Sequence, residues 1–230
     1  MKSLFSEKTI DFLIENKLRN DRVWFEEHRD LYNQHVIAPL VSLVQALEPV
    51  MMGIDSKLIC SPKIGGSISR IWRDARRPSK DKTIFRDIMW CMFIRQKNMG
   101  LPEYFFVISP KEFFYGCGYY AASSATMESI RKLIISGSSE FKAALSAFEN
   151  QNMFQIEGDF YKRSRYPDMP ENLKDWMDRK TLSFIHRSSD FQLLSSEQLS
   201  DVIAEGFKML APVYNFFIKA EENVKYSDLN

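Results

Sequence analysis

The apolar residues change their spacing twice along the chain, and this change limits the possible folds more than any other feature. Near the N-terminus they recur every three or four residues, as on one face of a helix. Between residues 67 and 119 they form short aromatic and β-branched runs separated by turn-like stretches, which is typical of strands. Helical spacing then returns. This order predicts an α+β fold with a mainly antiparallel central sheet, packed by N-terminal, middle and C-terminal helices, in a single domain over residues 1–230.

Capping residues and prolines predict where the helices begin and end. Ser6 and Asp21 are suited to cap the first two helices, and Pro39 is expected to kink or divide the second. Gly137 is a typical C-terminal stop for a helix in the middle of the chain. A long final helix is expected from about Ser195.

The strand pattern predicts the elements between these helices. Turn residues such as Gly, Pro, Asn and Ser separate the apolar runs. Strands are expected at residues 67–72, 88–95, 104–109, 113–119 and 181–186, with a hairpin at residues 155–163.

Composition narrows the class of protein. Hydrophobic residues make up 45% of the 230 residues, which is enough for a contiguous core and argues against disorder. No unbroken apolar run approaches the roughly 20 residues that span a bilayer, and acids interrupt the N-terminal stretch where an export signal would be apolar. We therefore expect a cytoplasmic protein with no membrane partner. Cys60, Cys91 and Cys117 are too few and too scattered for a disulfide framework or a zinc site.

The most chemically distinctive stretch is a basic segment at residues 70–86. Residues 70–87 contain seven basic and three acidic side chains, a surplus of four positive charges, whereas the whole chain has a net charge of only +1. Arginine forks and lysine ammonium groups are suited to hold phosphate or carboxylate. We therefore predict an anion-binding site, and its candidate residues are Arg70, Arg73, Asp74, Arg76, Ser79, Lys80, Asp81, Lys82 and Arg86.

Other interpretations of the segment stay open. The acids could neutralise the arginines in a purely structural salt-bridge web. Trp72 and Phe85 are most simply explained as core anchors. They could also stack nucleic-acid bases, and a nucleic-acid partner therefore stays an open alternative. A metal-independent hydrolase or transferase could use the arginines to stabilise developing negative charge, with Asp74, Asp81, Cys117 or a histidine as nucleophile or base.

Cofactor and metal motifs are not found in the sequence. It contains no Walker loop, GxGxxG fingerprint, GxSxG elbow or HExxH helix, so no cofactor is expected. His28 and His35 lie seven residues apart, too far to share one ion directly, and no metal site is expected. Gly116 and Gly118 flank Cys117 and predict a glycine bulge or a tightly packed strand rather than a reactive thiol.

The basic segment, RIWRDARRPSKDKTIFR, resembles the hallmark motif R-I-[YF]-R-D-x-R-F-S-x-D-K-x-P-[YF]-K of a conserved hypothetical family, a domain of unknown function in bacteria and fungi. Further landmarks of the resemblance are Trp24 with Phe25, the strand ending at residues 116–119, and Lys162 with Arg163. Arg77 and Pro78 stand where that family has one Phe, and Ile84 replaces its proline, so the loop is expected to differ in shape. The resemblance covers nearly the whole chain and implies no reaction, cofactor or partner.

Overall fold

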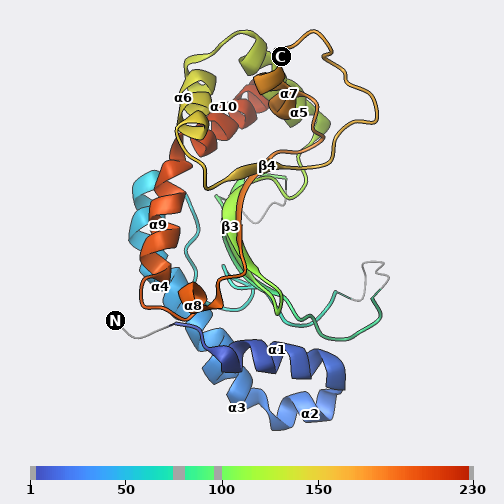
Figure 1. The fold of residues 1–230 in the computed structure, drawn as a ribbon, viewed down its shortest axis with the longest axis vertical. Coiled ribbons are helices and arrows are strands. Elements are labelled where there is room, and N and C mark those ends of the chain that lie inside the picture. Colours follow the sequence, from blue (N-terminus) through green and yellow to red (C-terminus); the bar gives the residue numbers. More distant parts are fainter. Residues whose placement is uncertain (1–3, 75–80, 96–99, 228–230) are drawn as a thin grey trace. The chain divides into compact units, whose positions relative to one another are not determined.

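The computed structural model describes residues 4–74, 81–95 and 100–227, with elements α1 to α10 and β1 to β5 along the chain (Figure 1). Contacts divide the chain into two compact units. Unit 1 consists of Met1–Phe93, Phe105–Tyr115 and Arg187–Ala204, and unit 2 consists of Ile94–Tyr104, Gly116–His186 and Glu205–Asn230. A single domain over residues 1–230 stays a prediction.

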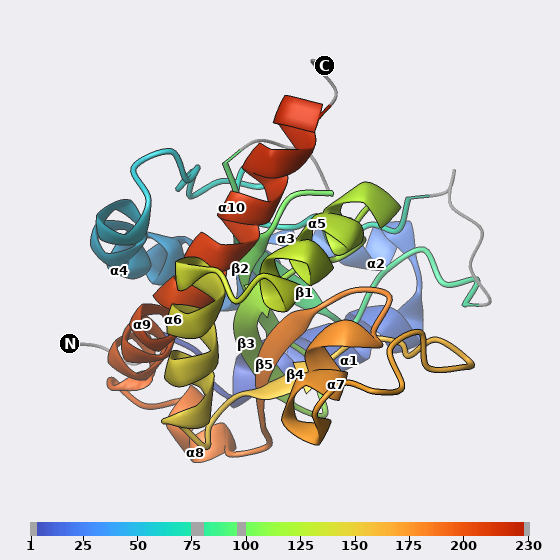
Figure 2. The same cartoon turned by 90° about the horizontal axis from the view of Figure 1, so that it is seen from above.

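A five-stranded antiparallel sheet confirms the α+β class. Its strands are, in order across the sheet, β1 (Met89–Phe93), β2 (Glu103–Ile108), β3 (Phe113–Gly118), β5 (Ser183–Ser188) and β4 (Gln155–Glu157). β5 therefore lies between β3 and β4 (Figure 2). β4 pairs with β5 in an antiparallel register that sets Gln155 opposite Ile185 and Glu157 opposite Ser183. The predicted strands at 88–95, 104–109, 113–119 and 181–186 thus exist with small shifts at their ends.

Unit 1 begins with α1 (Glu7–Arg19), α2 (Arg22–Glu27), α3 (Arg29–Tyr32) and α4 (Ala38–Ile54). Ser6 precedes α1, and its backbone N–H donates to Thr9 Oγ1 at 3.3 Å. Asp21 caps α2, because its Oδ1 accepts from the N–H groups of Val23 at 2.6 Å and Trp24 at 3.0 Å. A π-helix at Asn33–Ile37 leads into α4, whose first turn contains Pro39. Both caps are as predicted, whereas the helical run continues from Arg29 to Ile54 through Pro39, with the π-helix just before the proline.

The run from Arg29 to Ile54 is the one stretch of the described residues that is long and apolar enough to cross a membrane, judged by length and composition alone. Its apolar side chains recur on one face, where Val36, Leu40, Leu43, Leu47 and Met51 are fully buried. The exposed side carries polar residues such as Gln34, Gln45 and Glu48. This amphipathic pattern is that of a core helix, and α4 packs against β1.

The predicted strand at residues 67–72 is wrong. Ile68 forms an isolated bridge with Cys91 of β1, whereas Trp72 forms one with Phe85. The first half of this segment thus hydrogen-bonds to β1, with Ser69 N–H donating to Trp90 O at 2.9 Å. The second half pairs with the segment that follows it in sequence. Because the partner changes within six residues, no continuous ladder forms.

Unit 2 contains α5 (Ser124–Ile135), α6 (Ser139–Glu149), α7 (Glu171–Met177) and α10 (Ala211–Ser227). α10 packs against both α5 and α6 (Figure 2). Gly137 follows α5 with a φ of +60°, the left-handed conformation that a helix stop requires, as predicted. Trp176 of α7 is 1% exposed and lies among the rings of Phe141, Phe148 and Phe184.

Two other local predictions are wrong. Residues 155–163 do not form a hairpin, because β4 pairs with β5 and Phe160 bridges to Arg179 instead. The final helix, expected from about Ser195 with a bend at Pro212, begins at Leu199 and is divided into α9 (Leu199–Met209) and α10, and a separate short helix, α8 (Phe191–Leu194), precedes it. Pro212 lies in the first turn of α10, where its missing N–H is tolerated, and the helical run is broken just before it.

Candidate functional site

The basic segment folds back on itself within unit 1. Trp72 bridges to Phe85 in an antiparallel manner. Arg73 N–H donates to Ile84 O, and Arg86 N–H donates to Ile71 O, both at 2.9 Å. Ile71 is 1% exposed and Phe85 is fully buried. These apolar residues anchor the two described parts of the segment, residues 70–74 and 81–86, so the charged side chains of those parts are held at defined places on the surface of unit 1.

Asp81 lies at the centre of a set of charged contacts, the Asp81 network, formed by Lys17, Arg73, Asp81, Thr83 and Asp87. Asp81 Oδ1 accepts from the N–H of Thr83 at 2.9 Å and from its hydroxyl at 2.7 Å. Asp81 Oδ2 accepts from the Arg73 guanidinium. The Lys17 ammonium lies 2.9 Å from Asp87 Oδ2 and 3.5 Å from Asp81 Oδ2.

The electrostatics of this network favour fixed charges. The hydrogen bonds from Thr83, supported by Arg73 and Lys17, lower the pKa of Asp81 to about 2. The hydrogen bond to Asp87 raises the pKa of Lys17. Arg73 also donates from Nε to Thr83 Oγ1 at 3.1 Å. Arg73 and Asp81 are therefore partners in an internal ion pair, as the structural interpretation of the sequence expects.

Arg70 has different surroundings. It lies at a cavity of about 280 Å³, the Arg70 pocket, whose walls come from α2, α3 and the basic segment. Most of the lining is aromatic or aliphatic, and its residues are Phe25, Arg29, Tyr32, Asn33, Ile64, Arg70, Ile71 and Trp72. The Trp72 ring is partly exposed and packs 5.3 Å from the Phe25 ring and 4.4 Å from the Phe85 ring.

Few counterions are present at this pocket. Within residues 4–74, 81–95 and 100–227, no carboxylate lies within 4.0 Å of the Arg70 guanidinium, whose side chain is exposed. Arg29 is already paired, since its Nε donates to Glu26 at 2.8 Å. The Arg22 guanidinium carbon lies 5.9 Å from the centre of the Trp72 ring. The pocket therefore combines aromatic walls with an unneutralised arginine fork.

The other sequence-predicted site residues are dispersed. Lys82 is exposed and, within the described part of the chain, also has no carboxylate partner. Arg86 donates to Arg70 O at 3.1 Å and lies 5.0 Å from the centre of the Trp90 ring. Asp74 is half-buried and interacts with other groups. Arg76, Ser79 and Lys80 lie outside the described residues.

Sequence reasoning missed several residues that shape the two sites. Lys17 of α1 belongs to the Asp81 network, and Tyr32 and Asn33 line the Arg70 pocket. The helical spacing of Phe25 and Tyr32 predicts two core residues, and both are buried, but it does not predict that they line a pocket. Phe25 and Tyr32 lie seven residues apart, so the sequence indicates that they share one helical face. It does not indicate which segment packs on that face.

Cys117 is not placed for nucleophilic chemistry. It is fully buried in β3, and burial together with Glu103 raises the pKa of its thiol well above the usual value. A Cβ on Gly116 would overlap Phe184 O, and one on Gly118 would overlap Ser183 Cα, so these glycines allow β3 and β5 to approach closely. Their role in packing agrees with the interpretation favoured from the sequence.

No group of three or more His, Cys, Asp or Glu side chains in the described residues is arranged to hold a metal ion. His28 Nδ1 lies 2.8 Å from Trp24 O and its ring stacks on Trp24 at 4.2 Å. His186 Nδ1 lies 3.1 Å from Met153 O. These histidines have local structural partners.

Comparison with known proteins agrees with the resemblance of the basic segment. The family model of the conserved hypothetical protein DUF2461 matches residues 8–216. No curated protein matches the chain significantly. The matched range includes the Asp81 network, the Arg70 pocket and all five strands, and the chain belongs to the DUF2461 family of conserved hypothetical proteins.

Proposed function

We propose that this protein binds a small anionic ligand with a flat apolar body in the Arg70 pocket. The observation that carries the proposal is an arginine without a described carboxylate partner beside a cavity of about 280 Å³ with aromatic walls. This volume is just below the range of about 300–1,000 Å³ that is usual for ligand pockets, so a small ligand is expected. Phosphate or carboxylate would meet the Arg70 fork, and the flat body would lie against Trp72.

The surrounding residues favour this assignment within the basic segment. Arg73 is engaged by Asp81 and Thr83, so it has fewer donors left for a ligand. Arg70 donates to no described acceptor, and Asn33 adds an amide at the pocket wall. Phe85 is fully buried and cannot stack on a base, which leaves Trp72 as the single ring of the pair open to a ligand. A small molecule therefore fits better than an extended nucleic acid.

The alternative of a hydrolase or transferase has less support. A general base needs a pKa near the working pH, whereas Asp81 is held at about 2. Burial raises the pKa of Tyr32, the phenol in the Arg70 pocket. A buried Cys117 cannot act as nucleophile. We therefore prefer binding to catalysis for this pocket.

Isothermal titration with phenyl phosphate as the probe tests the proposal. We expect Arg70→Ala to weaken binding about 10- to 100-fold, because a hydrogen bond to a charged group contributes about 1.5–3 kcal/mol. Lys82→Ala is the matched control, since Lys82 is an exposed cation outside the pocket lining and should leave affinity nearly unchanged. Inorganic phosphate should bind more weakly than phenyl phosphate. Equal loss in both variants, or equal affinity for the two probes, would contradict the assignment.

A further inference from the structure

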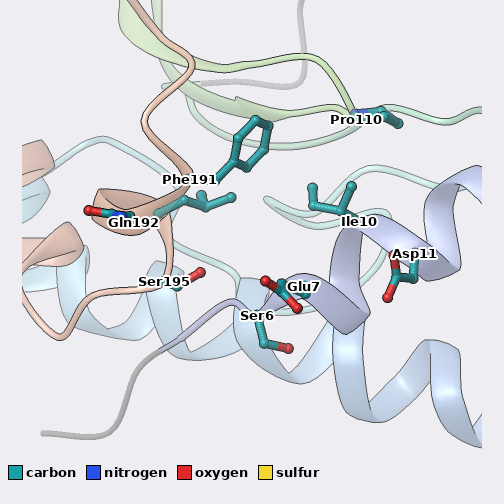
Figure 3. A pocket seen from close by; sticks show the side chains of 9 residues that line it. Ser6, Glu7, Ile10, Asp11, Pro110, Phe191, Gln192 and Ser195 are labelled. Carbon is teal, nitrogen blue, oxygen red and sulfur yellow. The ribbon is translucent and has the colours of Figure 1, made fainter.

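A second hollow in unit 1 lies at the start of α1, away from the Arg70 pocket. It has a volume of about 470 Å³, and its walls come from the first turns of α1, from Pro110 after β2, and from α8. Ile10, Pro110, Phe191 and Leu194 supply its apolar surface. Figure 3 shows Ile10 and Phe191 projecting into the hollow from α1 and α8, with the Glu7 carboxylate at its edge.

The apolar surface continues from this hollow along the exposed face of α1. Ile10, Ile14 and Leu18 lie four residues apart, so they form one ridge along the helix. Ile14 is 40% exposed and Leu18 is 78% exposed. The opposite face of α1 holds the helix in unit 1 through Phe12 and Leu13. The exposed ridge is therefore not needed to fix α1 in place.

Acidic side chains run beside the apolar ridge. Glu7, Asp11 and Glu15 are also four residues apart, and each precedes a ridge residue by three positions. Glu15 pairs with Arg19 at 3.2 Å. Glu7 and Asp11 have no basic side chain within 4.0 Å in the part of the chain that the structure describes, and the lining of the hollow includes these two acids and no base. α1 thus presents a row of apolar side chains with a row of acidic side chains beside it.

We propose that this α1 surface, formed by the hollow and the ridge from Ile10 to Leu18, docks a basic amphipathic helix of a partner protein. Such a helix would place one apolar side chain in the hollow and others against Ile14 and Leu18. Its lysine or arginine side chains would lie against Glu7 and Asp11. The ridge is about 12 Å long at 1.5 Å per residue, which matches two to three turns of a partner helix.

Charge argues against two other occupants. An anionic membrane surface would be repelled by Glu7 and Asp11. A second copy of this chain would bring the same unneutralised acids to the same contact if the two copies paired symmetrically. A basic partner relieves the repulsion that either of these would create.

Fluorescence anisotropy tests the proposal with the full chain and a labelled 14-residue helical peptide that has leucine on one face and lysine beside it. We expect Leu18→Glu to weaken binding at least tenfold, and Asp11→Lys to weaken it by a similar factor. Ile135→Glu and Glu128→Lys are matched controls on α5, where Ile135 is 62% exposed and Glu128 is also exposed, and both should bind as the wild type does. Circular dichroism melts show whether each variant remains folded.

A second peptide, in which glutamate replaces every lysine, distinguishes docking from nonspecific attraction. Wild type should not bind it, whereas Asp11→Lys should gain measurable affinity. A scrambled lysine peptide without an apolar face should bind at least tenfold more weakly than the ordered one. The proposal is overturned if the scrambled peptide binds equally well or if the α1 variants behave as their α5 controls do. Binding to vesicles of phosphatidylglycerol, or a dimer lost in Leu18→Glu by light scattering, would also overturn it.

Discussion

Arg70 and Arg73 lie three residues apart in the same basic segment, yet their surroundings are opposite. Arg73 is fixed by Asp81 and by the Thr83 hydroxyl at 3.1 Å. Arg70 lies beside an aromatic cavity and has no carboxylate partner in the described residues. The surplus of positive charge in the sequence therefore indicates that some cations lack counterions, but the fold decides which ones. A charged segment can contain both a structural network and a binding site.

The two regions share one apolar support. Phe85 is fully buried and contacts Trp72 of the pocket at 4.4 Å and Phe25 of α2 at 5.0 Å. Its backbone carbonyl oxygen also lies 2.9 Å from the hydroxyl oxygen of Thr83, which belongs to the Asp81 network. Loss of this ring should therefore remove contacts of the pocket directly and disturb the Asp81 network through a shift of the Phe85 backbone, whereas loss of a charge should disturb only one region.

The largest expected effect comes from Phe85→Ala, which removes this common support. We expect the free energy of unfolding to fall by about 3–5 kcal/mol, the usual cost of deleting a buried phenylalanine ring. Urea denaturation measures it. Phe160→Ala is the control, because that ring is 50% exposed and should cost far less. A loss below about 1 kcal/mol for Phe85→Ala would show that the two regions do not depend on this ring.

Glu103 offers a contrast with Asp81, because burial, rather than hydrogen bonds and basic neighbours, shifts its pKa. It begins β2 in unit 2, and burial raises its pKa from the ordinary 4.5 to about 7. The folded state then holds a proton that the unfolded state has lost, so stability falls as pH rises from about 4.5 to 7. The fall is at most about 3 kcal/mol. We expect Glu103→Gln to remove it, with urea midpoints above wild type at pH 8 and close to it at pH 4.5.

Arg73→Ala and Arg70→Ala should separate stability from binding. Arg73→Ala is expected to lower the free energy of unfolding by about 1–2 kcal/mol, since it removes a partly buried ion pair and a hydrogen bond. Arg70→Ala should change it by less than about 0.5 kcal/mol, because Arg70 is exposed and makes no side-chain contact of this kind in the described residues. If Arg70→Ala is the more destabilising variant, Arg70 has a structural role and the comparison fails.

Much of the fold follows from local patterns. The caps at Ser6 and Asp21 and the stop at Gly137 were predicted because each depends on a few neighbouring residues. The strand at 67–72 was wrong because its partner changes along its length, which depends on contacts distant in sequence. α7 was not predicted because only seven residues form it and only Trp176 and Met177 are buried.

The candidate site was predictable only in part. The basic segment identified Arg70, Arg73 and Asp81, because charge density is visible in the sequence. It did not identify Lys17, which lies 64 positions before Asp81 and reaches it only in the fold. The aromatic wall of the Arg70 pocket depends in the same way on helices packing against the segment. The kinds of charged residue at the site were therefore predictable from the sequence, whereas the partner of each charged side chain was not.

The smallest expected effect is the acid dependence that Asp81 contributes. Its pKa is about 2 in the folded state and 3.8 ordinarily, so its charge stabilises the fold above about pH 4. This contribution is lost as pH falls through 2. We expect Asp81→Asn to lower stability slightly at pH 7 and to narrow the difference from wild type between pH 4 and 2, since the amide still accepts from Thr83 but carries no charge.

Thermal unfolding of both proteins across this pH range measures the difference. Asp11→Asn is the control, because it removes a carboxylate that has no described basic side chain within 4.0 Å. A constant gap between Asp81→Asn and wild type from pH 7 to 2 would mean that Arg73 and Lys17 gain nothing from the Asp81 charge. Arg73 would then be as available to an anion as Arg70, and the distinction between the network and the pocket would disappear.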